Sequence, residues 1–211
     1  MPDAPEEAQD GEPLAAMPTP DDGTRASDEQ AWDEGTRPAG PQPDPDARYS
    51  PQQQAAGQHL IDVHDALRGE LDQLRDLVEQ VGQGHADASA VRSFINRMTI
   101  RQNDWTLGVY CASYCRAVAG HHSLEDQSVF PHLRGADPQL DPVITRLGEE
   151  HEVITTLLDR IDEALIALVS HEEDGMERVR AEVDLLGDAL LSHLSYEERE
   201  LVEPLARLGF Y

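Results

Sequence analysis

The sequence predicts an all-α protein: an antiparallel four-helix bundle preceded by a disordered, acidic N-terminal tail. Three observations support this fold class. Residues 51–211 carry apolar residues at the three- and four-residue spacing of amphipathic helices, and no stretch shows the period of two that a half-buried strand requires. The connections between the last three helical stretches are short, which favours antiparallel neighbours. Residues 1–50 show no such periodicity.

The tail, residues 1–50, is rich in proline and glycine and contains 13 acidic residues against three arginines. A segment this polar buries too little apolar surface to offset the entropy lost on ordering, so disorder is predicted. The remaining residues, 51–211, are numerous enough to cover one apolar core. We therefore expect a single bundle domain after the tail.

Four apolar stripes define the four bundle helices. The first helix begins at Pro51 and ends near the glycines at 82 and 84, and the third begins at Asp141-Pro142. A shorter apolar repeat near 88–101 predicts a connector helix between the first and second stripes. The stripes consist of Leu60, Leu67, Leu71, Leu74 and Val78; of Leu107, Cys111, Tyr114, Val118 and Val129; of Ile144, Leu147, Ile154, Leu158, Ile161, Leu165 and Leu168; and of Val179, Val183, Leu186, Leu190 and Leu201.

Charge and cysteine content exclude several functional classes. The net charge is −26 and the chain has no lysine, which argues against nucleic acid and against an anionic membrane surface as partners. No apolar run is long enough to span a membrane, and the N-terminus lacks the pattern of a signal peptide. Cys111 and Cys115 are the only cysteines and do not form a disulfide framework. We expect a cytoplasmic protein, and no protein partner is indicated.

Each apolar stripe is interrupted by a histidine, and two stripes also contain a glutamate four residues later. Burying such a group without a partner costs roughly 2–7 kcal/mol when it is neutral and far more when it is charged. An α-helix rises about 1.5 Å per residue, so the distance of each polar residue from the expected end of its helix can be compared between helices. By this measure the interruptions lie at one level of the bundle. They are His64, His121 with Glu125, His151, and His193 with Glu197.

Two of these interruptions repeat one pattern, His-x3-Glu followed by a second acid, an apolar pair and a proline. A histidine and a glutamate at i and i+4 share a helix face, so each pair can hold one metal ion. Four imidazoles and two carboxylates in a bundle core suit a two-metal site, with Glu125 and Glu197 as bridges. A hydrogen-bonded polar layer without metal is the competing interpretation. The coincidence of four helices at one level favours the metal.

Four segments of the sequence carry a resemblance to a known family. They are HDALRGEL around His64, HHSLEDQSVFP from His121, EEHEVI around His151 and HLSYEERELVEP from His193. With them, the chain from about residue 55 to its C-terminus resembles the hemerythrin-like (HHE cation-binding) domain proteins. The resemblance implies an antiparallel four-helix bundle with a non-haem di-iron centre. It implies as iron ligands His64, His121, Glu125, His151, His193 and Glu197, with the two glutamates as bridges.

The sequence departs from the oxygen-carrying members at one position. Those members place a second histidine one turn after the first on the third helix, where this chain has Thr155. Two alternatives follow. Either one iron keeps an open or water-filled position, or His122, which flanks the second stripe as closely as His121 does, supplies the missing ligand. Asp126 is expected to face away.

The resemblance implies two non-haem iron ions as cofactors, although manganese or zinc would also fit a histidine-carboxylate site. The expected partner is a small diatomic or peroxide ligand: dioxygen, nitric oxide or peroxide. The function would then be binding for sensing or storage, or redox chemistry. One alternative is an enzyme that turns over peroxide or nitric oxide, and another is a metal-stabilised helical interaction module. Motifs of hydrolases, kinases and zinc fingers are absent from the sequence.

Overall fold

The computed structural model describes residues 11–83, 100–172 and 174–209, with only the backbone of residues 100–110 and 112. Over these ranges the chain is helical, and its one β pairing is an isolated bridge between Glu12 and Tyr49. The elements are η1 (Glu34–Thr36), α1 (Pro51–Gly82), α2 (Ile100–Leu124), η3 (Glu125–Val129), α3 (Phe130–Ala136), η4 (Pro138–Leu140), α4 (Asp141–Val169) and α5 (Gly175–Leu208).

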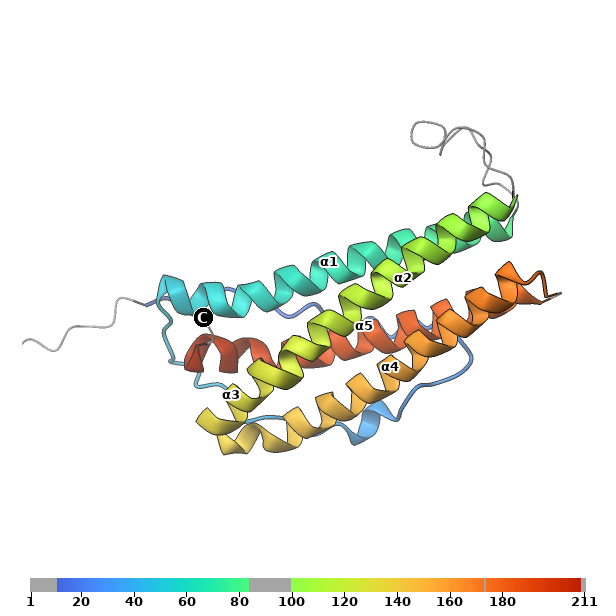
Figure 1. Ribbon diagram of the computed structural model, residues 1–211. Coiled ribbons are helices and arrows are strands. Elements are labelled where there is room, and N and C mark those ends of the chain that lie inside the picture. Colours follow the sequence, from blue (N-terminus) through green and yellow to red (C-terminus); the bar gives the residue numbers. More distant parts are fainter. Residues whose placement is uncertain (1–10, 84–99, 173, 210–211) are drawn as a thin grey trace, which may run out of the picture.

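The four long helices form the predicted bundle. Helix α5 packs against α1 and α4, and α2 packs against the same two helices from the other side (Figure 1). The all-helical fold class is thereby confirmed. The connector helix predicted near 88–101 lies outside the described residues except for its last two positions, which begin α2. None of the helices in the described ranges is long and apolar enough to cross a membrane.

Two helix starts follow from local sequence. Ser50 caps α1: its side chain accepts a hydrogen bond from the Gln53 N–H, and the Gln53 side chain accepts one from the Ser50 N–H. Pro51 follows at the first helical position, where its missing N–H costs nothing. Helix α4 begins at Asp141, with a proline in its first turn, as the sequence predicts.

The second bundle helix contains a π-helical turn, η3, which the sequence analysis does not predict. The N–H of Phe130 bonds to the carbonyl of Glu125, one residue further back than in an α-helix. One extra residue shifts the helical phase by about 100° between the segment that carries His121 and the segment after Val129. Both Val129 and Phe130 are buried as a result.

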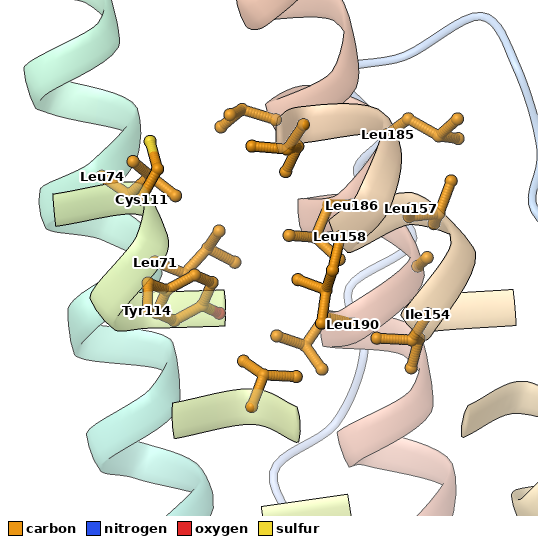
Figure 2. Packing of buried hydrophobic residues seen from close by; sticks show 14 of the residues in the cluster. Leu71, Leu74, Cys111, Tyr114, Ile154, Leu157, Leu158, Leu185, Leu186 and Leu190 are labelled. Atoms are coloured by element: carbon orange, nitrogen blue, oxygen red, sulfur yellow. The ribbon is translucent and has the colours of Figure 1, made fainter. Parts of the chain in front are cut away.

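Two apolar clusters fill the bundle, one on each side of a polar layer. Figure 2 shows the larger cluster, in which side chains of α1, α2, α4 and α5 point toward one another. The smaller cluster lies toward α3 and the C-terminal end of α5. The larger cluster includes Leu71, Leu74, Cys111, Tyr114, Ile161 and Leu190, and the smaller includes Leu60, Phe130, Leu133, Leu147 and Leu201.

The segment predicted to be a disordered tail has a defined path from residue 11 onward, and residues 1–10 lie outside the described residues. Residues 11–50, here called the N-terminal strap, run along α5 and back again (blue in Figure 1). On the outward path the N–H groups of Ala26 and Ser27 donate to Asp188, and on the return Tyr49 donates to Glu203. Composition does not reveal these contacts because hydrogen bonds and ion pairs, together with a few apolar side chains such as Ala16 and Trp32, hold the strap on the bundle.

Candidate metal centre

The polar layer between the two apolar clusters contains the six histidines and glutamates predicted as ligands and His122, the alternative ligand, which makes seven side chains. Six of them are buried, with exposed fractions between 0 and 4 %. The seventh, His121, exposes 10 % of its side chain. The structure therefore brings together His64 from α1, His121 and His122 from α2, Glu125 from η3, His151 from α4, and His193 and Glu197 from α5.

The seven side chains divide into two groups. In each group the residues offer ligand atoms that all lie within 4.8 Å of one another. The mixed group combines two imidazoles with two carboxylates, and the imidazole group has three imidazoles. The mixed group is His64, His121, Glu125 and Glu197, and the imidazole group is His122, His151 and His193.

The adjacent histidines of α2 separate into different groups. Neighbouring residues on a helix point about 100° apart, so the two rings can face two different ions. His121 Nε2 lies 3.1 Å from His64 Nε2, whereas the His122 ring stacks on the His151 ring with centroids 4.0 Å apart. Thr155 donates its hydroxyl to the His151 carbonyl one turn earlier on α4. His122 thus lies with His151 and His193 in a group whose nitrogens could hold one ion together.

Each glutamate faces both groups. Glu125 Oε1 lies 3.1 Å from His121 Nε2, and its Oε2 lies 3.6 Å from His151 Nε2. Glu197 Oε2 lies 3.5 Å from His64 Nε2 and 3.6 Å from the Nε2 of His193. A carboxylate that bridges two ions has to lie close to the ligand residues of both, as these two glutamates do.

Three further carboxylates hold the outer nitrogens of the histidines. The Nδ1 atoms of His64, His193 and His151 lie 2.9, 3.0 and 2.9 Å from carboxylate oxygens. A histidine whose Nδ1–H donates to a carboxylate keeps Nε2 free to bind a metal and is held in that orientation. The carboxylates belong to Glu198, Glu150 and Asp126, respectively.

The sequence positions of these outer carboxylates do not reveal their role. Glu198 and Glu150 are chain neighbours of predicted ligands, but nothing in their spacing distinguishes them from solvated acids. Asp126, expected to face away, is partly exposed and yet reaches His151. The only available signal was the doubling of acids beside ligand positions, in Glu149-Glu150-His151 and in Glu197-Glu198.

Two of these carboxylates are buried and are neutralised by arginines. Arg68 lies 2.8 Å from Glu198, and Arg37 binds both oxygens of Glu150 at 2.8 and 2.9 Å. Burial opposes ionisation of Glu150, but hydrogen bonds from His193 and Arg37 lower its pKa to about 2. Against the same opposing effect of burial, the hydrogen bond from His64 lowers the pKa of Glu198. Both therefore remain carboxylates at neutral pH.

Burial acts on the ligands in the opposite sense. It lowers the pKa of His121 to about 3 and that of His122 well below its usual value, so their rings are neutral. Burial also raises the pKa of Glu125 well above the ordinary carboxyl value, with Glu197 adding repulsion. Without a cation, the site thus favours neutral His121 and His122 rings and at least one protonated carboxyl group.

Several ligand atoms are buried without a hydrogen-bond partner among the described residues. Leaving a buried polar atom unpaired costs about 1–3 kcal/mol, so a group of them needs an explanation. A cation between them supplies one, because nitrogen lone pairs and carboxylate oxygens are the donors that transition metals take. The atoms are Nε2 of His122, His151 and His193, Oε2 of Glu125, and both carboxylate oxygens of Glu197.

A small pocket between α2 and α4 adjoins the imidazole group. Its volume is about 210 Å³, and His122 and His151 form part of its wall. Thr155 also lines it. Its remaining walls are Ala119, Ser123, Asp126, Gln127 and Glu152.

The fold and the site define a helical-bundle protein built to hold metal cations in its core. Comparison with protein families agrees: the model of the hemerythrin HHE cation binding domain matches residues 56–205, and the chain belongs to this family. Comparisons with curated proteins and with solved structures returned no match.

Proposed function

We propose that the protein holds two non-haem iron ions, one in each group, and binds a small ligand such as dioxygen, nitric oxide or peroxide at this centre. The observation that carries the proposal is that Glu125 and Glu197 each face a histidine of both groups. Two carboxylates shared between two groups of ligands are not needed in a single-metal site, whereas they are a regular feature of di-iron centres in helical bundles.

The residues have distinct roles in this proposal. His64 and His121 hold one ion, the imidazole group holds the other, and the two glutamates bridge the ions and balance their charge. When bound, the irons would supply electrons and coordination positions for the small ligand. Each residue of the mixed group offers one ligand atom, four in all, against the six that octahedral iron takes, so room for a ligand remains.

The surrounding residues keep the centre dry and rigid. The two apolar clusters close the layer from both sides, and the Phe130 ring stacks on His151 with centroids 5.3 Å apart. Excluding water limits side reactions of a bound ligand. The outer carboxylates fix the ring orientations, so the donor atoms are in place before any ion binds.

Elemental analysis of protein purified without oxygen tests the proposal. We expect two iron ions per chain in the wild type and lower content in His193→Ala and Glu125→Ala. Thr155→Ala is the matched control, because it changes the wall of the pocket and removes no ligand. Undiminished iron in both ligand variants would refute the ligand assignment, and manganese or zinc in place of iron would refute the choice of metal.

A second function, turnover of peroxide or nitric oxide, is favoured by the pocket beside His122. Its Ser123 and Asp126 side chains bring polar groups that can assist proton transfer near the centre, which reversible binding does not need. Exposing the di-ferrous protein to oxygen separates the two functions. A stable, reversible oxygenated spectrum supports binding, and rapid irreversible oxidation supports turnover.

We also propose a cytoplasmic setting and no nucleic-acid partner. Burial raises the pKa of the Cys111 thiol to about 12 and that of Cys115 to about 11, so both thiols stay protonated. Neither cysteine is in a disulfide, as the reducing cytoplasm favours. The charge of −26 would repel phosphate backbones. Cofractionation with cytoplasmic markers, and the lack of a mobility shift with DNA or RNA, would check these expectations.

A further inference from the structure

We infer that Arg37 of the N-terminal strap is a positioning residue of the metal centre: through Glu150 it orients His193, so the strap retains the ion of the imidazole group. The inference rests on the proposed metal binding. It gives the acidic N-terminal segment a role that neither its composition nor the family match implies, because the match begins only at residue 56.

The connection consists of two consecutive contacts. Arg37 Nε donates to Glu150 Oε1 at 2.8 Å, and Nη2 donates to Oε2 at 2.9 Å. Glu150 Oε2 in turn lies 3.0 Å from His193 Nδ1, on the far side of the ring from the ligand nitrogen Nε2. The arginine and glutamate side chains expose only 8 % and 1 % of their surface. A buried, bidentate, charge-assisted pair of this kind fixes the plane of the carboxylate as well as its position.

Arg37 is itself fixed on α5. Its Nη1 donates to the hydroxyl of Ser192 at 2.8 Å, and its guanidinium lies 4.7 Å from the centre of the Tyr196 ring. The Tyr196 hydroxyl donates to the carbonyl of Pro38, the next strap residue, at 2.8 Å. Arg37 is therefore held by several contacts on the helix that carries His193, and it is not a mobile surface charge.

A second arginine, Arg146, also reaches Glu150 but cannot replace Arg37. It contacts only Oε1, at 2.9 Å, and its side chain is more exposed, at 18 %. The oxygen that faces His193 is Oε2, and of the two arginines only Arg37 binds it. Loss of Arg37 would leave this buried oxygen half paired and free to turn away from His193.

The strap makes a corresponding contact at the mixed group. The backbone N–H of Thr19 donates to Glu198 Oε2 at 2.7 Å, and Glu198 Oε1 holds His64 Nδ1. The strap thus donates hydrogen bonds to one outer carboxylate beside each group, Glu198 beside the mixed group and Glu150 beside the imidazole group. Arg68 supports Glu198 from α1 independently of the strap, so the imidazole group depends on the strap more strongly.

Metal retention in the full-length protein tests the inference. Wild type and variants are loaded with cobalt(II), and loss of each ion to excess chelator is followed by the cobalt absorption bands. We expect Arg37→Ala to lose one of its two ions roughly ten- to a hundredfold faster, with altered bands for that ion, and to retain the other at the wild-type rate.

The control variant is Arg160→Ala. Arg160 also ties the strap to the bundle, through Glu29, but it has no contact with the outer carboxylates. It should lose both ions at wild-type rates. Equal acceleration in Arg37→Ala and Arg160→Ala would overturn the inference, because any loosening of the strap would then suffice. Wild-type rates in Arg37→Ala would overturn it as well.

A double-variant cycle tests whether Arg37 acts through Glu150. If it does, Arg37→Ala combined with Glu150→Gln should lose the ion no faster than Glu150→Gln alone. Additive acceleration would contradict this route. Arg37→Lys keeps the charge but loses the bidentate geometry, so it should lose the ion at an intermediate rate. If Arg37→Ala does not fold, Arg37→Lys replaces it in the comparison with the wild type. Wild-type protein that binds no cobalt, iron, manganese or zinc would instead refute the proposed function itself.

Discussion

The larger apolar cluster and the polar layer are equally buried parts of the same four helices, yet they make opposite contributions to stability. In the cluster, Leu71 and Ile161 are fully buried and satisfied by the side chains around them. In the layer, His193 and Glu197 are equally buried, but His193 Nε2 and both Glu197 oxygens lack hydrogen-bond partners in the part of the chain that the structure describes. The cluster stabilises the bundle by itself, whereas the unpaired polar atoms of the layer destabilise it, and a bound cation would offset that cost.

The largest expected effect is a loss of stability, without a loss of metal, when a side chain of the larger apolar cluster is truncated. Leu71 is fully buried, so Leu71→Ala should lower the free energy of unfolding by roughly 2–5 kcal/mol while the folded variant keeps its metal. Denaturant titration and elemental analysis measure the two quantities. Leu124→Ala, at a position that is 57 % exposed, should change stability by no more than about 0.5 kcal/mol. Metal loss from folded Leu71→Ala would remove the distinction between the two regions.

Metal removal tests the layer itself. A ligand that binds only the folded state stabilises it by about 2.7 kcal/mol when its concentration is a hundred times the dissociation constant. Chelation should therefore lower the midpoint of thermal unfolding, and metal should return it. An unchanged midpoint would contradict a destabilised empty layer, and it would also exclude a metal-stabilised interaction module.

Substituting His122 and Thr155 separately compares the metal affinity of a variant within the polar layer with that of a variant beside it. His122→Ala removes a ligand atom from the imidazole group and should weaken metal binding at least tenfold, which is about 1.4 kcal/mol. Thr155→Ala removes only a hydroxyl bonded within its own helix and should leave affinity nearly unchanged. Competition with a coloured chelator measures both. Equal effects would assign His122 to packing.

The smallest effect is a pH dependence of binding. Burial raises the pKa of Glu125 above its ordinary 4.5 and raises that of Glu197, so the metal-free pair holds at least one proton that a cation must displace. Apparent affinity should rise with pH until both pKa values are passed. Calorimetry in buffers of different ionisation enthalpy should detect about one proton released per chain, and fewer for Glu125→Gln. Zero release by the wild type would contradict the raised pKa.

Stability of the metal-free protein follows from the same shift. A carboxyl group whose pKa is raised in the folded state binds more protons there than in the unfolded chain. Its contribution to stability is therefore greatest below the ordinary pKa of 4.5 and is lost as the pH rises toward the folded value. Metal binding removes this dependence because it replaces the proton.

The fold and most of the candidate ligands in the polar layer were predictable because both depend on patterns within single helices. Apolar spacing identified the four helices, and polar interruptions such as His151 and His193 could be placed at one level from the helical rise alone. The sequence alone does not show that His121 and His122 belong to two different groups of ligand residues. This division depends on where the rings of neighbouring helices lie, which spacing along one chain does not specify.

The supporting residues could not be predicted because they pair across elements that are distant in sequence. Arg37 and Glu150 are 113 positions apart, and Arg37 lies in a segment without apolar periodicity. The π-helical turn at Glu125–Val129 has a similar cause: the helix accommodates one extra residue so that the segments on either side can both face the core. Tertiary contacts decide both features.

The central claim is that two ions share Glu125 and Glu197 between the mixed and imidazole groups. Anomalous diffraction at the iron edge, from crystals grown with ferrous iron and without oxygen, tests it most directly. The account predicts two peaks, one beside the Nε2 atoms of His64 and His121 and one beside those of the imidazole group, with both glutamates touching each ion. A single peak, or two ions with His122 turned away, would contradict it.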